Sequence, residues 1–314
     1  MTPASVDPRP RRFRKPYHSV EVTRGPRTKA VTDRQREEVE RFLRTGESDP
    51  LYLVWPGDVF ERSRSAEGEM RAALIDDVHK RARAAPTHIC HPTVNDLVGL
   101  TRQRVEPMVR GLFPTTEQDP VLQILEQSVV VLTPENIASV LRETTWMHTA
   151  WDLANLYLAS VGASLLSAEA PGLVGLSEET TCYVSIAYFR ELGRFEDFIV
   201  HEAAHIFHNC KRHTMGLPES SAREWPLDIA YDKRETFAYS CEAFSRIVEL
   251  GGTRQARLAL VRELADGHVP ETDRFDAQEY VSILTEAAGA RNGWKHILSR
   301  CAPLRHRRRP PGPL

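Results

Sequence analysis

Apolar residues recur every three or four positions along most of the chain, which is the pattern of helices that bury one face. The first such stretch, residues 34–44, places Val39, Phe42 and Leu43 on one face. The same spacing predicts further helices at 67–85, 94–113 (interrupted around Pro107), 134–161, 195–210, 233–250, 253–266 and 276–299.

Short runs of β-prone residues interrupt this helical pattern. Residues 51–55 and 129–132 are each expected to form a strand. Residues 173–176 and 181–186 are separated by four polar residues, which predicts a hairpin. The expected fold class is therefore α+β, mainly helical, with a small antiparallel sheet.

The two ends of the chain differ in charge from its body. Ten Lys and Arg residues face three acidic ones in residues 1–36, and residues 300–314 hold five Arg and no acid, so the region between them is acidic. Such tails could contact nucleic acid weakly, but their composition favours solvated, disordered ends. The expected divisions are a tail at 1–33, a mainly helical region at 34–165, a domain at 166–300 and a tail at 301–314.

The composition is that of an ordinary globular protein, with 41% hydrophobic and 27% charged residues among 314. No apolar run has the length that a membrane helix needs, and no apolar segment typical of a secretory signal follows the basic N-terminus. The five cysteines are widely spaced and form no CxxC pair. Reduced thiols and a cytoplasmic location are expected.

One motif carries the candidate chemistry. Residues 201–205 read His-Glu-Ala-Ala-His, an HExxH sequence flanked by apolar residues on both sides. Residues four apart share one face of a helix, so His201 and His205 can bind one metal ion. On a buried helix these polar groups need partners, because unpaired polar groups are costly there.

Zinc suits this site, because it prefers imidazole ligands and performs no redox chemistry. Glu202 lies beside the two histidines without being a ligand, and from there its carboxylate can take a proton from a metal-bound water. Peptide hydrolysis by a water activated in this way is the expected reaction, and Glu202 is its catalytic residue.

This stretch resembles the HExxH zinc metallopeptidases, in particular the glutamate-type zincins, over roughly residues 173–250. The resemblance implies a zincin-like domain at 166–300, with a third zinc ligand, a glutamate, on the helix after the motif. It also implies that the hairpin before the motif helix binds an extended peptide. The metzincin subclass is excluded, because His208 stands where its pattern has Gly and Lys211 where it has a third His.

Two glutamates compete for the place of the third ligand. Glu235 and Glu242 are seven residues apart and share a helix face, and Ala238 between them permits close helix packing. Glu235 is chosen, since its E-x-x-A context resembles the ligand helix of the glutamate-type zincins; Glu242 would then orient a histidine. If Glu235 serves only in a capping box with Asp232, Glu242 becomes the ligand.

Other residues receive weaker interpretations. His208 could assist the metal site or lie on the helix surface, and Tyr231 and Tyr239 could stabilise an oxyanion, although packing roles are favoured for both. His213 receives no role. A second group, His79, His88, Cys90 and His91, matches no standard metal spacing and is interpreted as a loop.

The sequence thus predicts a cytoplasmic zinc-dependent metallopeptidase that acts on a peptide or protein substrate and not at a membrane. Two alternatives remain at this point. The chain could be a non-catalytic binding or regulatory protein that retains a structural metal site, or an amidase with a non-peptide substrate.

Overall fold

The computed structural model describes residues 32–85, 96–173, 175–185, 193–219 and 223–303. The described chain is mainly helical with one small sheet, which confirms the expected fold class. The helices are α1 (Asp33–Thr45), α2 (Val59–Ala84), α3 (Leu97–Leu112), α4 (Thr115–Leu125), α5 (Ile137–Glu143), α6 (Met147–Ser160), α7 (Phe198–Asn209), α8 (Arg234–Leu250), α9 (Arg254–Ala265), α10 (Ala277–Gly289) and α11 (Gly293–Cys301). None of them has the length and apolar character needed to cross a membrane.

The sheet has three strands in the order β1-β3-β2, namely β1 (Val129–Val131), β3 (Thr181–Val184) and β2 (Gly175–Glu178). The expected hairpin is present, because β2 and β3 pair antiparallel. It is tighter than expected, since Ser177 and Glu178, assigned to the turn from sequence, belong to β2. β1 pairs parallel to β3, so the complete sheet is mixed rather than purely antiparallel.

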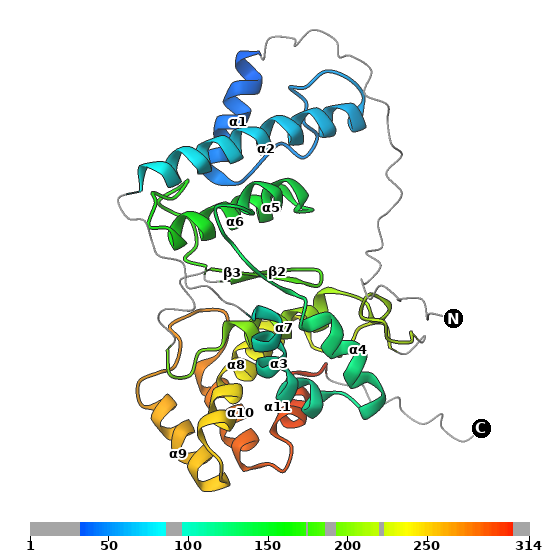
Figure 1. Ribbon diagram of the computed structural model, residues 1–314, viewed down its shortest axis with the longest axis vertical. Coiled ribbons are helices and arrows are strands. Elements are labelled where there is room, and N and C mark those ends of the chain that lie inside the picture. Colours follow the sequence, from blue (N-terminus) through cyan, green and yellow to red (C-terminus); the bar gives the residue numbers. More distant parts are fainter. Residues whose placement is uncertain (1–31, 86–95, 174, 186–192, 220–222, 304–314) are drawn as a thin grey trace, which may run out of the picture.

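The sheet separates two apolar cores (Figure 1). Neighbouring residues of a strand point to opposite faces, so Cys182 and Val184 enter the larger core, formed with α3, α4 and α7–α11. Tyr183 enters the smaller core, formed with α1, α2, α5 and α6. The helices α3 and α4, which precede residue 165 in the sequence, pack in the larger core with the C-terminal helices.

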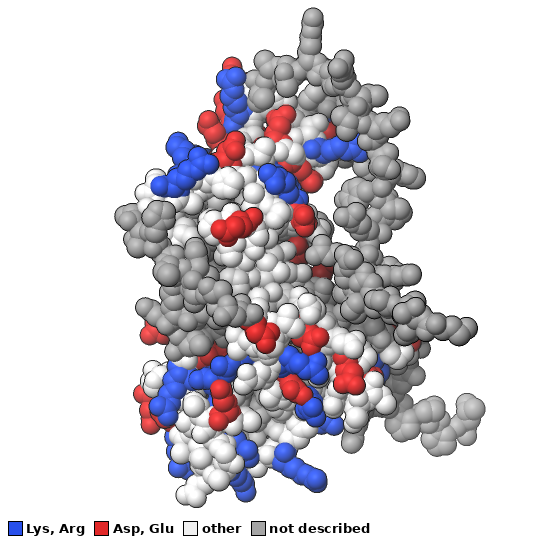
Figure 2. All heavy atoms as spheres, in the orientation of Figure 1, with Lys and Arg blue, Asp and Glu red and all other residues white. Residues whose placement is uncertain are grey.

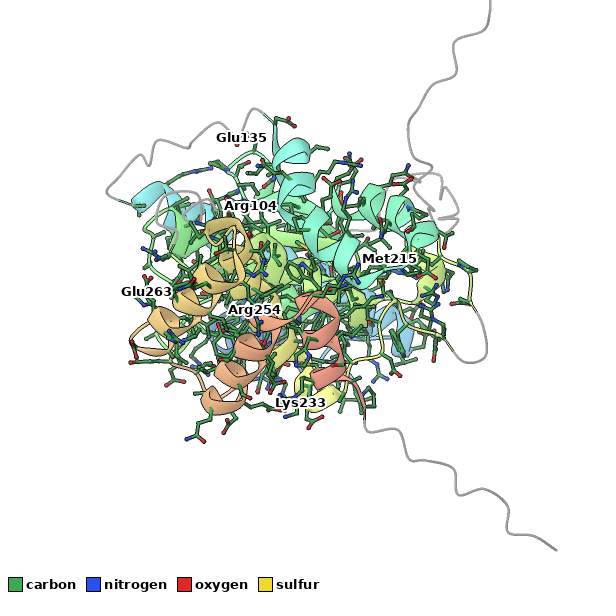
Figure 3. The ribbon with its side chains drawn as sticks, turned by 90° about the horizontal axis from the view of Figure 1, so that it is seen from below. Arg104, Glu135, Met215, Lys233, Arg254 and Glu263 are labelled. Atoms are coloured by element: carbon green, nitrogen blue, oxygen red, sulfur yellow. The ribbon has the colours of Figure 1, made fainter. Side chains whose placement is uncertain are left out.

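Charge follows this layering. Figure 2 shows Lys, Arg, Asp and Glu side chains over the upper and lower layers, and a largely uncharged band across the middle of the same face. Seen from below, α8 to α11 lie together, with Lys233 at the edge of the group (Figure 3). Positive and negative side chains are mixed within each layer, so the visible face carries no field of a single sign.

The strand expected at residues 51–55 is wrong. The Asp49 carboxylate accepts hydrogen bonds from the backbone N–H groups of Leu51 and Leu53, and Tyr52 adopts a left-handed φ of 49°. The segment is a turn between α1 and α2 from which Tyr52, Val54 and Trp55 pack against the smaller core. An apolar run of this length does not by itself distinguish a strand from a turn that packs on a core.

The single helix expected at 134–161 is also wrong, because the chain breaks into α5 and α6. The Arg71 guanidinium on α2 donates to the backbone carbonyls of Leu141 and Thr144, the latter at 2.7 Å. These bonds satisfy carbonyl groups that a continuous helix would have used. The break is therefore set by a residue 70 positions away.

The helix expected at 276–299 is likewise divided, into α10 and α11. Asn292 caps α11 by accepting from the N–H of Lys295, and its amide donates to the carbonyl of Gly111 at 2.9 Å. A Cβ atom at position 293 would lie 2.2 Å from the Phe244 ring, so only glycine fits there.

Two helix limits differ in detail. α2 begins eight residues earlier than expected, because Asp58 and Glu61 form a capping box at its start. α3 continues through Pro107, where an interruption was expected. The core positions that surround this proline, Val105 and Met108, are fully buried and keep the helix in place.

A buried ion pair fixes the connection between α7 and α8. Arg212 is 1% exposed, its Nη2 lies 2.6 Å from Glu117 Oε1 on α4, and its Nε donates to the carbonyl of Pro218. This connection, marked by Met215 in Figure 3, leads into the first turn of α8. The pair therefore anchors this connection to α4.

Replacing Glu117 with Gln is expected to lower the free energy of unfolding by about 3–5 kcal/mol, because a buried guanidinium loses its counter-charge. Urea unfolding followed by circular dichroism measures the change. Glu106→Gln is the matched control, since the Glu106–Arg110 pair is largely exposed and worth about 1 kcal/mol or less. Equal stability of the two variants would contradict the structural role of the pair.

Candidate metal centre

α7 carries the HExxH residues in the larger core. Asp197 caps the helix by accepting from the N–H of Val200 at 3.3 Å, and the apolar flanks of the motif are buried. The rings of His201 and His205 lie on one face with centroids 4.9 Å apart. The motif is thus on a buried helix, as the sequence predicted.

Glu235 on α8 joins these two histidines. The Nε2 atoms of His201 and His205 are 3.2 Å apart, and Glu235 Oε2 lies 3.9 Å from His205 Nε2. Ligand atoms of the three residues all fall within 4.8 Å of one another. Two nitrogens bound tetrahedrally at about 2.0–2.1 Å from zinc would be about 3.3 Å apart, so the observed spacing suits this ion.

Glu242, the rival for the third position, is engaged elsewhere. Its Oε2 accepts from His201 Nδ1 at 2.9 Å, and its Oε1 accepts from the N–H of Asp197 at 3.1 Å. Glu235 takes no part in the capping box considered from sequence, because α8 begins without a side-chain cap. Glu235 Oε2 is instead buried without a hydrogen-bond partner. An orphaned carboxylate oxygen beside two imidazoles fits a cation.

A chain of hydrogen bonds orients His205. His205 Nδ1 lies 3.1 Å from His208 Nε2, and His208 Nδ1 lies 3.1 Å from Asn209 Oδ1. The Asn209 amide nitrogen donates to Ser177 Oγ on β2 at 3.3 Å, which leaves its oxygen towards His208. His208 is neutral at pH 7, because burial, followed by the charge of Arg234, lowers its pKa to about 4.

These bonds determine where the ring protons lie. A carboxylate only accepts, so His201 carries its proton on Nδ1, next to Glu242. His208 donates to Asn209 from Nδ1 and therefore accepts from His205 Nδ1. Both ligand histidines then have their Nδ1 atoms engaged, and their Nε2 atoms face each other at 3.2 Å. A metal ion at this point could be bound by one lone pair from each Nε2.

Glu202 lies on the side of α7 that β2 covers. A Cβ atom at position 175 would be 3.0 Å from Glu202 Cγ and Oε1, so a larger residue here would crowd the Glu202 side chain. Burial raises the pKa of Glu202 to about 7, against the opposing effects of His201 and a hydrogen bond from Ser177. A carboxyl group that titrates near neutral pH can both accept and return a proton.

Sequence reasoning missed Gly175, Ser177 and Asn209. Gly175 and Ser177 are two residues apart on β2, so they share the strand face towards α7, and this spacing is the signal in the sequence. Asn209 follows directly after His208, so its contact with that ring was open to inference from the sequence. The link from Asn209 to Ser177 depends on how the sheet packs against α7, which no local pattern indicates.

The other candidates have different surroundings. The Tyr239 ring packs against His201 and Phe275, with centroids 4.6 and 4.8 Å away. Tyr231 is 83% exposed. His213 pairs with Glu219 at the surface and is not in the metal cluster, in agreement with the sequence. An oxyanion role for either tyrosine stays a prediction.

The remaining sequence interpretations are only partly covered by the structure. Of the weaker group of potential metal ligands, His79 lies on α2, and His88, Cys90 and His91 lie outside the described residues. Most of both basic tails also lies outside them. The four described cysteines, Cys182, Cys210, Cys241 and Cys301, are buried free thiols, as expected.

Replacing Asn209 with Leu is expected to weaken zinc binding by about 10- to 100-fold, because the hydrogen-bond chain no longer fixes the ring of His205. Competition with a chromophoric chelator measures the affinity. Asn209→Asp should bind zinc more tightly than Asn209→Leu, since a carboxylate still accepts from His208. Unchanged affinity in Asn209→Leu would show that the chain of bonds has no influence on the metal.

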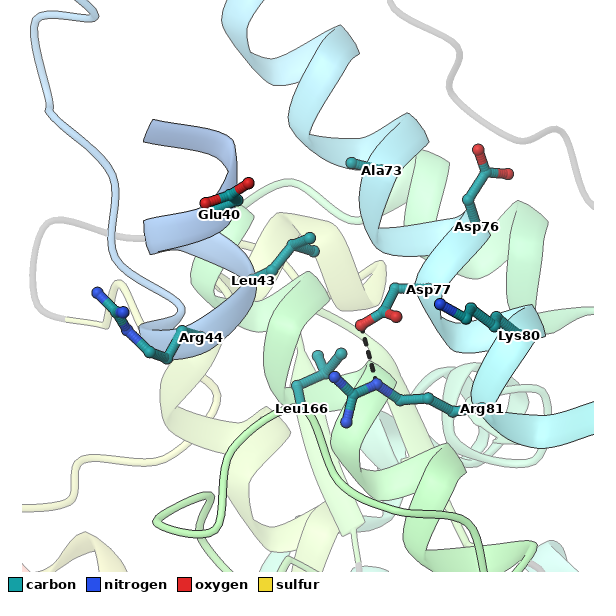
Figure 4. A pocket seen from close by; sticks show the side chains of 9 residues that line it. All are labelled: Glu40, Leu43, Arg44, Ala73, Asp76, Asp77, Lys80, Arg81 and Leu166. Carbon is teal, nitrogen blue, oxygen red and sulfur yellow. Dashed lines mark hydrogen bonds and ion pairs between the residues drawn. The ribbon is translucent and has the colours of Figure 1, made fainter. Parts of the chain in front are cut away.

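A separate cleft of about 530 Å³ lies between α1 and α2 (Figure 4). Asp77 and Arg81 form an ion pair there at 2.8 Å. The cleft is lined mainly by charged side chains of both signs: Glu40, Arg44, Asp76, Asp77, Lys80 and Arg81. It contains none of the metal-cluster residues and offers no nucleophile with a base, so the candidate chemistry stays with α7 and α8.

In comparisons with known proteins, no family model, no curated protein and no solved structure matches this chain.

Proposed function

We propose that this chain is a zinc-dependent metallopeptidase that acts in the cytoplasm, with a site similar to that of the glutamate-type zincins. His201, His205 and Glu235 hold the metal, and Glu202 is the general base. The observation that carries the proposal is the meeting of two histidine Nε2 atoms with a buried carboxylate oxygen that has no hydrogen-bond partner.

When bound, zinc polarises a carbonyl group and lowers the pKa of water. Glu202 supplies the proton chemistry that this metal lacks. Its carboxylate accepts a proton from the attacking water and returns it to the leaving nitrogen, which requires a pKa near the working pH. Burial beneath β2 gives Glu202 such a pKa, about 7.

The position of β2 supports a peptide substrate over other amides. β2 is an edge strand, since the described sheet has the order β1-β3-β2. Gly175 and Ser177 place this strand beside Glu202. An extended peptide can pair with such an edge through its backbone groups, which brings its carbonyls past the site.

Catalysis is favoured over a purely structural metal. Structural zinc sites are commonly closed by four protein ligands, whereas catalytic sites keep a position open. The cluster here offers three protein ligands within the described residues. A structural site also has no need for a further acidic group, Glu202, buried beside the ligands.

Cleavage of a diverse peptide mixture by the full chain, followed by mass spectrometry, tests the proposal. Cleavage is expected to stop when a chelator removes the metal and to return when zinc is added. A protein that binds zinc, loses thermal stability on its removal and cleaves no peptide would instead be the binding protein with a structural metal.

A further inference from the structure

Two arginines lie beside the candidate ligand Glu235. Arg274 Nη1 is 3.8 Å from Glu235 Oε2, and its side chain is 47% exposed. Arg234 immediately precedes Glu235 at the start of α8, and its guanidinium lies over the Tyr231 ring, 4.9 Å from the centroid. One cationic group therefore touches the metal cluster, and a second lies next to it.

Arg234 lacks the counter-charge that nearby cations have. Lys233 pairs with Glu279, and Arg246 pairs with Glu249. No carboxylate of the described segments lies within ion-pair distance of Arg234, and its buried Nε has no hydrogen-bond partner. An unsatisfied buried donor of a charged group is costly, so a protein that keeps one beside a reactive site needs a reason.

The net charge around Glu235 becomes more positive once a metal ion is bound. Among the described residues, Glu235 is the carboxylate within ion-pair distance of Arg274, and as a metal ligand it would share its charge with the ion. On the opposite side of the metal cluster, the side chains of Ser177 and Asn209 are uncharged. The positive side of the site is therefore the α8 side.

We propose that Arg234 and Arg274 form a carboxylate-binding subsite, so that the enzyme prefers substrates with a negative charge next to the cleaved bond. This inference rests on the proposed peptidase function and names its substrate class. The carboxylate belongs to an acidic side chain or to the C-terminus of the peptide, and both sources have the same chemistry.

Arginine is suited to this task. Its planar guanidinium presents five N–H donors that match the two oxygens of a carboxylate. Stacking on the exposed Tyr231 ring holds the plane of Arg234 while the edges of the guanidinium remain able to donate. The half-exposed Arg274 can turn from Glu235 towards a bound anion.

Binding to an inactivated full chain tests the subsite without depending on turnover. Zinc-loaded Glu202→Gln protein is titrated with fluorescent peptides that differ only in one group. One pair of peptides has an internal Asp or Glu in one member and Asn or Gln in the other. A second pair differs at the C-terminus, which is a free carboxylate in one member and an amide in the other. The carboxylate form is expected to bind about tenfold more tightly, as for a charge-assisted pair. The peptide pair that shows the preference identifies whether the bound carboxylate belongs to a side chain or to the C-terminus.

The arginine variants assign the preference to these residues. Arg234→Gln and Arg274→Gln, each in the Glu202→Gln protein, should lose the preference while still taking up zinc and binding the neutral peptides. Arg234→Lys should keep part of it, because the charge remains. Arg262→Gln, at an exposed position on α9, is the control and should keep all of it.

The outcomes separate this inference from the function on which it rests. Zinc-dependent cleavage together with equal binding of charged and neutral peptides would overturn the carboxylate subsite alone. A preference that survives in the Arg234→Gln, Arg274→Gln double variant would also overturn it. A zinc-loaded protein that neither binds nor cleaves any peptide would overturn the peptidase function as well.

Discussion

Peptide hydrolysis is expected to fall by about 10²- to 10⁴-fold when Glu202 is replaced with Gln, because the reaction loses its general base. Glutamine preserves the shape of the side chain, but its amide cannot accept the proton of the attacking water. Zinc content should not change, since Glu202 is not among the three residues whose ligand atoms converge. Turnover of a quenched peptide and metal analysis of the same sample provide the two measurements.

The same variant should be at least as stable as the parent protein at neutral pH. Burial raises the pKa of Glu202 in the folded protein to about 7, whereas a glutamate carboxyl group in an unfolded chain titrates near its ordinary pKa of 4.5. Ionisation therefore opposes folding increasingly above that lower value, and Gln removes this penalty. Glu263→Gln, in a partly exposed pair with Arg194, is the control for loss of charge. Full activity of Glu202→Gln would remove Glu202 from the mechanism.

Glu235 and Glu242 are expected to respond very differently to the same substitution. Glu235→Gln replaces a candidate ligand carboxylate with a weakly binding amide, so zinc affinity should fall by more than about 100-fold. Glu242→Gln only weakens the orientation of His201, for which about 10- to 100-fold is typical. Chelator competition on both purified variants measures the difference. The reverse order would make Glu242 the ligand.

The local part of the site could be predicted from sequence because it depends on helix geometry. Two histidines four residues apart must share a face, and this fixed the position of His201, Glu202 and His205 before any tertiary contact was known. Glu235 could be chosen over Glu242 only through a resemblance. Its proximity to His205 and the engagement of Glu242 by His201 depend on how α8 packs against α7.

The misassigned elements share a physical cause. Helix breaks after α5 and α10 are set by Arg71 and by the contact of Gly293 with Phe244, which come from distant parts of the chain. The apolar run at 51–55 contributes to a core from a turn held by Asp49. Local propensity is overridden in each case by tertiary hydrogen bonds or packing. The contact of Ser177 with Asn209 also depends on tertiary packing, so it could not be predicted from the sequence.

X-ray absorption at the zinc edge of the purified full chain tests the central claim most directly. We expect one zinc ion per chain in a shell of nitrogen and oxygen atoms at about 2.0–2.2 Å, with imidazole scattering and no sulfur at about 2.3 Å. His201→Ala should abolish this signal. A protein that takes up no zinc, or a zinc shell that contains cysteine sulfur, would contradict a metal centre formed by His201, His205 and Glu235.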